Sequence, residues 1–318
     1  MAINAVTTTS LNDFTNSALV VPFVIAALSE QGGFDKYARE FQIPDGTGTA
    51  TIPTETSWWG TPNDRGAGVD TEFDATQGVD LGNTSAASGS VTLSTGEYGV
   101  AMEITDNVIE DSVRGIDIFN WLNGRHLHAI RLARTDDFCA LFAGLSNSVG
   151  STGVDLTIAQ LIAAQQGVRV RGAVSDTQVY VLDNEQVLNV ETALVAGSTS
   201  MAIYALSADR LIGYAPTINN GMDEQRQVMT FRGCPVYSTG LTDTANAAAD
   251  VVGAFFCVST AVNDASGATT FGAGWRRLPR LETDRIAIGR STMLVTTARW
   301  GCTEIQDGSG TAIITDAP

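Results

Sequence analysis

Apolar and polar positions alternate in the first third of the chain, and the alternation predicts strands. Between Val91 and Ile104 two alternating runs flank Thr95-Gly96, which indicates a strand, a turn and a strand. The stretch Gly46–Trp58 predicts a further short strand, and Pro53 either places it at a sheet edge or ends it. Residues 50–105 are therefore expected to form a long projecting hairpin.

Elsewhere the apolar period lengthens and predicts helices. One short helix is expected in Asp106–Ser112, and a long one, about 40 Å, follows Asp117 and runs to Gly144. The long helix has apolar residues on more than one face, which predicts packing on several sides. Further helices are expected over 18–42, after Thr157 in capping-box relation to Gln160, after Asp183, and after Ser207.

The second half of the chain adds strand-like runs between these helices. They lie in 177–183, 226–239 and 251–260, with two more alternating strands in 286–305. Mixed helices and strands in this order predict an α+β fold. No internal repeat and no clean linker divides the 318 residues.

The charge of the chain is negative and unevenly distributed. Its formal net charge is −17, and residues 1–113 alone carry 16 acids against 3 bases. Part of this acidic block, residues 60–90, has no sustained apolar period and is expected to be a long functional loop. Such a charge argues against non-specific binding to DNA or anionic membranes, and opposed blocks could attract each other within or between copies.

Basic residues gather near the end of this acidic chain. The stretch Trp275–Arg290 holds five of the seventeen arginines: Arg276, Arg277, Arg280, Arg285 and Arg290. A basic run alone would suggest nucleic acid, yet the whole-chain charge opposes that interpretation.

The sequence offers no catalytic, cofactor or metal site. Phosphate-loop, dinucleotide and hydrolase signatures are missing, and the four cysteines have no metal-site spacing. His126 and His128 point apart on a helix, so structural roles are expected for both. The acid pairs Glu110-Asp111 and Asp136-Asp137 are expected to be charges on a helix face, or to pair with Arg114 and Arg134, rather than to catalyse. The run Ala18–Leu28 is too short to span a bilayer.

The order of these features resembles the major capsid proteins of tailed double-stranded-DNA bacteriophages, the Hong Kong ninety-seven type of fold. The most specific pieces are "ITDNVIEDS" before the long helix and Gly-x-Pro-Val at 233–236. The resemblance implies an N-terminal arm at 1–48, an extended loop at 49–104, a peripheral domain with a long spine helix at 105–155 and 275–318, and an axial domain at 156–274.

The resemblance also implies function and partners. Copies of the chain would form the hexamers and pentamers of an icosahedral shell around packaged DNA, in a virion assembled in the host bacterial cytoplasm. A portal, a separate scaffolding protein and a cement protein are implied partners, with no membrane and no cofactor. Some relatives cross-link the extended loop through lysine, but this loop has none and Lys36 lies in the arm, so non-covalent contacts are expected.

The arginines then have an expected role. In the family the extended loop lies over the peripheral domain of a neighbour, so the five arginines are hypothesised to pair with acids of a neighbouring loop, Asp70, Glu72, Asp74 and Asp80. Pairing with local Glu282 and Asp284, or solvated positions on a strand, is the plainer alternative, and contact with packaged DNA is a third. Three other functions stay open: an encapsulin-like protein nanocompartment, a soluble α+β enzyme, and a phage tail or cement protein.

Overall fold

The computed structural model describes the chain in several ranges, and the account below is confined to them. They are 5–6, 33–44, 46–57, 87–110, 118–171, 173, 177–196, 212–214, 227–246, 249–259 and 268–316. The acids at 70, 72, 74 and 80, and the rest of the loop at 58–86, lie outside them.

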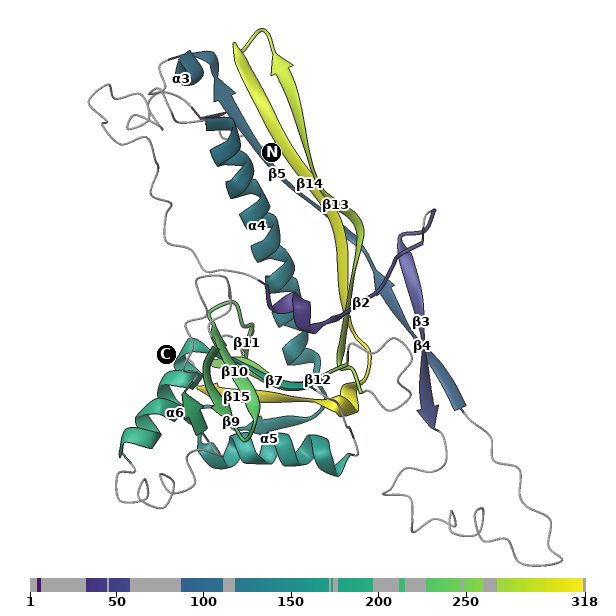
Figure 1. Ribbon diagram of the computed structural model, residues 1–318, viewed down its shortest axis with the longest axis vertical. Coiled ribbons are helices and arrows are strands. Elements are labelled where there is room, and N and C mark those ends of the chain that lie inside the picture. The colour runs from purple at the N-terminus through teal and green to yellow at the C-terminus, as the bar shows by residue number, and fades with distance from the viewer. Residues whose placement is uncertain are drawn as a thin grey trace, which may run out of the picture.

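A five-stranded sheet forms one long side of the molecule (Figure 1). Its order is β1-β5-β14-β13-β2, and the antiparallel centre pairs β14 with β5 and β13. β13 and β14 are the longest strands of the sheet, with 16 and 14 residues. The bounds are β1 Ala5–Val6, β2 Arg39–Glu40, β5 Gly96–Thr105, β13 Phe271–Ile286 and β14 Ser291–Glu304.

Helix α4, Ile118–Ala140, runs along this sheet (Figure 1). A 3-10 turn, η3, continues it from Leu141 to Gly144, where the sequence predicted the end. Ile118 and Leu122 pack with Ile104 of β5 and Leu294 of β14 in one buried cluster, which the short helix α3, Asp106–Glu110, closes. The predicted packing on several sides is confirmed, since Leu122, Ile130 and Phe138 belong to three different buried clusters. Leu127 is an exception and is 43% exposed.

An eight-stranded sheet forms the second body, in the order β6-β15-β12-β7-β10-β9-β8, with β11 on β12. Its strands are β6 Ser148–Gly150, β7 Thr177–Asp183, β8 Ile212–Tyr214, β9 Gln227–Phe231, β10 Cys234–Thr239, β11 Thr244–Ala245, β12 Asp250–Val258 and β15 Gly310–Asp316. The ladder thus joins strands from residues 148–150 and 310–316 to the middle of the chain.

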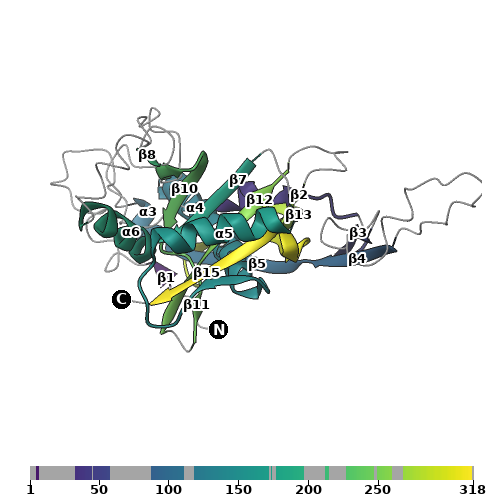
Figure 2. The same cartoon turned by 90° about the horizontal axis from the view of Figure 1, so that it is seen from below.

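Both faces of this sheet are covered, and β7 illustrates how. Val179 and Val181 face a cluster with Phe138 of α4, whereas Tyr180 and Leu182 face a cluster with α5, Ile158–Val170, and α6, Asn184–Ala196. The side chains alternate because successive residues of a strand point to opposite faces. Figure 2 shows α5 lying across the strands. The end of α4 therefore joins the second body to the first.

The caps predicted for the two covering helices are confirmed. Thr157 and Gln160 form a complete capping box at α5. At α6, the Asp183 carboxylate accepts a hydrogen bond from the Glu185 backbone N–H, 2.8 Å away. Such caps satisfy backbone N–H groups that have no partner inside the helix.

The projecting hairpin is confirmed, with a correction at its base. β3, Thr49–Ser57, pairs antiparallel with β4, Ala87–Ser94, and Pro53 lies in this two-stranded edge ladder. β5 does not belong to the hairpin, since it leaves Thr95 to pair with β14. At Thr95-Gly96, where a strand–turn–strand was expected, the chain instead passes from β4 of the two-stranded sheet to β5 of the five-stranded sheet.

Two predicted helices are corrected within the described ranges. Residues 33–42 contain a 3-10 turn, η1 Phe34–Tyr37, and β2, because the backbone turns at Gly33 (φ 133°) and β2 adds to the edge of β13. The helix expected after Ser207 is wrong at Ile212–Tyr214, which pairs antiparallel with β9. Pairing with distant strands overrides the local pattern in both places.

Candidate inter-subunit surface

The arginine-rich stretch lies on β13, the outer long strand of the five-stranded sheet. Within the described residues, β2 covers its outer edge only at Gly272 and Ala273. From Leu278 to Arg285 nearly every side chain is exposed, and Leu278 is 67% exposed. An uncovered edge strand offers backbone N–H and C=O groups to another chain. This edge is therefore a candidate contact surface.

Two of the arginines pair with acids of the same chain far away in sequence. Arg277 contacts Glu97 of β5, with 2.7 Å between Nη2 and Oε1. Arg285 makes a two-pronged pair with Asp106 at the start of α3. The hydrogen bond from Arg285 lowers the pKa of Asp106 below its usual range. Both acids belong to the acidic first third, so part of the charge attraction is intramolecular.

The other three arginines lie differently. Arg280 reaches Glu282 on its own strand at 3.3 Å, and both side chains are well exposed. Arg290 holds a left-handed backbone conformation (φ 46°) in the β13–β14 turn, where its carbonyl accepts the Asp106 N–H. Arg276 is half-buried. Glu282 is thus confirmed as a local partner of one arginine, while contacts with a neighbouring loop stay a prediction.

A second cationic group, missed at the level of sequence, lies under the same strand. Arg134 of α4 is 5% exposed and pairs with Asp35 at 3.2 Å and Glu40 at 2.9 Å. Its guanidinium also lies 4.2 Å from the ring centre of Trp275. The partners expected for Arg134, Asp136 and Asp137, are not the ones it contacts in these pairs, and Asp137 accepts the Trp300 indole N–H instead.

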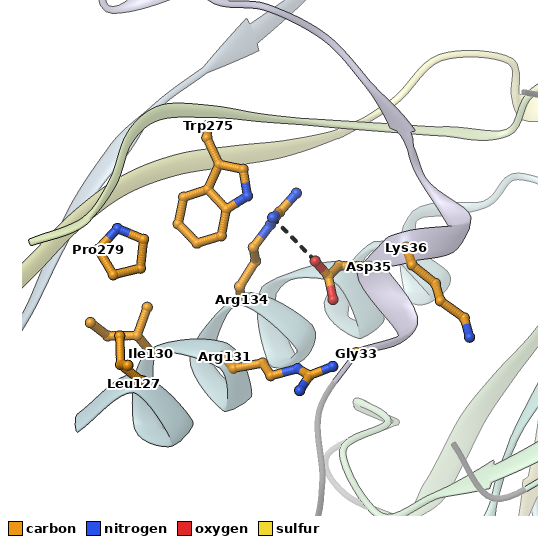
Figure 3. Close-up of a pocket in the computed structure, with 9 residues that line it drawn as sticks. All are labelled: Gly33, Asp35, Lys36, Leu127, Ile130, Arg131, Arg134, Trp275 and Pro279. Carbon is orange, nitrogen blue, oxygen red and sulfur yellow. Dashed lines mark ion pairs between the residues drawn. The ribbon is translucent and has the colours of Figure 1, made fainter. Parts of the chain in front are cut away.

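Beside this arginine a hollow of about 330 Å³ opens between α4, η1 and β13 (Figure 3). Its walls combine apolar and cationic side chains with one carboxylate. The lining residues are Gly33, Asp35, Lys36, Leu127, Ile130, Arg131, Arg134, Trp275 and Pro279. Gly33 is fixed at the lip because its N–H donates to Thr135 Oγ1 at 2.8 Å.

The base of the hairpin packs against two facing glycines, Gly274 of β13 and Gly301 of β14. A Cβ on Gly301 would lie 2.1 Å from the Ser94 carbonyl oxygen, and one on Gly274 would lie 2.5 Å from that of Phe41. Leu93 is fully buried beside them with Ile43 and Ile52. The close approach that glycine permits fixes where the hairpin leaves the sheet.

The titratable side chains of one histidine and of the cysteines lie in the packed parts of the described fold. His126 is buried, with Nδ1 3.0 Å from Thr296 Oγ1, and burial lowers its pKa. The four cysteines are free thiols, and in the described ranges no group of three or more His, Cys, Asp or Glu side chains is placed to hold a metal ion. Within the same ranges, no helix combines the length and apolarity needed to cross a membrane.

Comparison with known proteins gives matches by structure alone. No protein-family profile and no curated protein sequence matches the chain. The head structure of Helicobacter pylori bacteriophage KHP40 superposes with a TM-score of 0.63 at 11% identity, covering 100% of this chain and 98% of that one.

Two further solved structures give the same result. Mycobacterium phage Che8 matches with a TM-score of 0.61 at 12% identity, over 94% of this chain and 96% of that one. The capsid of a native GTA particle matches with a TM-score of 0.61 at 12% identity, over 97% and 98%. Since these matches span nearly the whole of each chain, the protein has the α+β fold of tailed-phage capsid structures.

Proposed function

We propose that this chain is a major capsid protein, which self-assembles into the hexamers and pentamers of an icosahedral shell that encloses packaged double-stranded DNA. The observation that carries the proposal is the extent of the structural match, 94–100% of this chain against phage and GTA capsids. The shell would be assembled in the cytoplasm of the host bacterium.

The layout of the fold supports a division of labour within the subunit. We assign residues 49–104, which include the hairpin and its connection, to the extended loop. We assign α4 and the paired strands β13 and β14 to the peripheral domain, at 105–155 and 275–318. The arm would be 1–48 and the axial domain 156–274. No lysine lies between residues 49 and 104, so the proposal includes no lysine-based cross-link. A scaffolding protein, a portal and a cement protein enter it through the resemblance alone.

The edge of β13 is the proposed contact with a neighbouring subunit. Arginine pairs carboxylates through two parallel hydrogen bonds, and the loop acids at 70, 72, 74 and 80 supply them. Arg276, Arg280 and Arg290 would contribute along with Arg277 and Arg285, whose internal pairs with Glu97 and Asp106 leave part of each side chain exposed.

The function is tested by expressing the chain and imaging the product by negative stain. Closed icosahedral shells support it, and a protein that stays monomeric or dimeric across concentrations contradicts it. Nucleic-acid content of particles from infected or induced cells then separates a DNA-filled capsid from a protein nanocompartment with protein cargo.

The interface is tested by charge reversal with an internal control. Arg280→Glu is expected to block assembly while the subunit stays folded. Arg285→Glu alone also breaks the internal pair, so it is combined with Asp106→Arg, which restores that pair with the charges exchanged. If the double variant still fails to assemble, Arg285 contacts a neighbour; normal shells from Arg280→Glu and from the double variant would refute the arginine interface.

A further inference from the structure

We propose that the free edge of β13 pairs antiparallel with the same edge of a second copy of this chain, with Leu281 of one copy opposite Leu281 of the other. The contact is made by the backbone and side chains of β13 alone. It involves no residue of the extended loop. It would be one of the subunit contacts of the shell, and to that extent the inference rests on the proposed function.

The edge of β13 is open over the stretch concerned. β13 is the outermost long strand of the five-stranded sheet (Figure 1). Among the described residues, β2 pairs with it only at Gly272 and Ala273, so no described strand covers the edge from Arg280 onward. Leu281 is apolar and yet 39% exposed there. Unpaired backbone groups beside an exposed apolar side chain favour the addition of another strand.

The hydrogen bonds of β14 show which residues of β13 direct their backbone groups to that edge. The Asp106 N–H donates to the Arg290 carbonyl at 2.8 Å, at the end of the β5–β14 ladder. Because alternate residues of a central strand bond to opposite neighbours, the even-numbered residues of β14 bond toward β5 and the odd-numbered ones toward β13. Thr296, opposite Leu281, is even-numbered. Leu281, and with it Thr283, therefore directs its own N–H and C=O to the free edge.

This direction restricts how two identical strands can pair. Residues that direct their backbone to the edge must lie opposite one another, so the two-fold axis passes through a residue rather than between two residues. Leu281 lies opposite Thr296 on the face toward α4. Since successive side chains alternate, Arg280, Glu282 and Asp284 lie together on the other face. Their charges therefore meet across the axis.

These charges select one register. With the axis at Leu281, Arg280 of each copy lies opposite Glu282 of the other, and no like charges meet between positions 280 and 284. With the axis at Arg280, Glu282 or Asp284, that residue faces its own copy, and with the axis at Thr283, Glu282 faces Asp284. Like charges directly opposite each other destabilise a strand pair, whereas opposite charges stabilise it.

The selected register also accounts for the exposed leucine. The two Leu281 side chains would contact each other on the α4 face, which removes apolar surface from water. Their backbones would exchange two hydrogen bonds across the axis. Pro279 and the bulge before Arg280 end the ladder on one side. A strand that is complementary in both charge and apolar contact to itself identifies a second copy as the partner.

The register is tested by disulfide trapping of Leu281→Cys. The two cysteines would lie about 5.5 Å apart at Cα, which is within disulfide range, so mild oxidation should give a linked dimer on a non-reducing gel. Thr283→Cys is the matched control on the same face, with its two cysteines about 13 Å apart, and should give at least about tenfold less dimer. The wild type measures the background from the four native thiols.

The charge pairs are tested by mixing two variants, Arg280→Glu and Glu282→Arg, each in the Leu281→Cys protein. Either variant alone sets like charges opposite each other and should give at least about fivefold less dimer. An equal mixture should restore it as a heterodimer, identified by a tag on one variant, because every glutamate then faces an arginine. The pair within one strand cannot account for the restoration, since both variants lack it.

The outcomes separate this inference from the proposed function. Wild-type shells with no Leu281→Cys dimer, as when the chain's own residues 7–32 occupy the edge, would overturn the pairing and leave the capsid function intact. A mixture without extra heterodimer, or more dimer from Thr283→Cys than from Leu281→Cys, would also overturn it. A Leu281→Cys dimer from a protein that forms no shells would support the pairing and contradict the capsid function. Absence of both would overturn both.

Discussion

Arg134 lies with its guanidinium 4.2 Å from the ring centre of Trp275 while it pairs with Asp35 and Glu40. This one side chain connects the long helix α4, the η1–β2 segment and the long strand β13. Removing the charge of Arg134 from water is costly, and the two carboxylates and the aromatic ring each offset part of that cost. The three partners therefore stabilise the buried cation together.

Replacing Arg134 should therefore destabilise the subunit strongly. Arg134→Met keeps the length of the side chain but leaves Asp35, whose side chain is 16% exposed, without its cation, and we expect a loss of about 3 kcal/mol. Arg134→Lys should lose less, since it keeps the charge. Urea unfolding of the unassembled subunit measures both, and equal stability of Arg134→Met and the wild type would refute the role assigned to this pair.

Gly301→Ala should unseat the hairpin. Its Cβ would meet the Ser94 carbonyl at 2.1 Å, so backbone must move, and overpacking of this kind costs roughly 1–3 kcal/mol or more. Faster proteolysis within 49–94 is the expected readout, along with a lower unfolding midpoint.

Gly124→Ala is the matched control for that substitution. Outside the neighbouring backbone of α4 itself, no atom lies within 4 Å of the added Cβ, and alanine is the better helix former by about 1 kcal/mol. The control should raise the unfolding midpoint. Hairpin proteolysis unchanged by Gly301→Ala would contradict the seat described for Ser94.

Local signals in the sequence predicted the local parts of this fold. Thr157 and Gln160 are three residues apart, and Asp183 directly precedes its helix, so both caps could be recognised before any tertiary contact was known. The length of α4 could be predicted for the same reason, because its apolar period is sustained.

Partners far apart in sequence could not be predicted in that way. Arg277 and Glu97 are 180 positions apart, and Arg134 and Glu40 are 94 apart. Nothing in the neighbourhood of Arg134 distinguishes it from a surface arginine; its adjacent acids Asp136 and Asp137 even suggest the wrong partners. β13 was missed as one long strand because Pro279 and the charges interrupt the alternation, and two bulges accommodate them.

The buried imidazole of His126 should make the subunit sensitive to acid. Burial lowers its pKa below the usual 6.5, so the folded state disfavours the charged ring. The resulting stability is complete above pH 6.5 and is lost as the pH falls through the folded pKa, because the unfolded chain takes up the proton first. His126→Gln should flatten this part of the pH–stability curve, and identical acid slopes for the two proteins would count against it.

Glu304, at the end of β14, should produce the opposite slope. Burial, together with the charge and the hydrogen bond of Asp307, raises its pKa to about 7. Asp307 is itself held by the Ser146 backbone N–H at 2.7 Å, at the junction between the two sheets. With a folded pKa above the unfolded one, the folded state binds more protons between the two values. Stability must therefore fall as the pH rises from about 4.5 to 7, and level off above that.

Glu304→Gln isolates this effect, since it keeps the shape of the side chain and cannot ionise. The variant should match the wild type near pH 5 and exceed it in unfolding free energy at pH 8, where the wild-type carboxylate is charged beside Asp307. Asp307→Asn should give a smaller gain, because it removes the like charge but also weakens the bond to Ser146. Urea midpoints at the two pH values provide the measurement. A variant whose advantage is the same at both pH values would show that Glu304 is not protonated in the folded subunit.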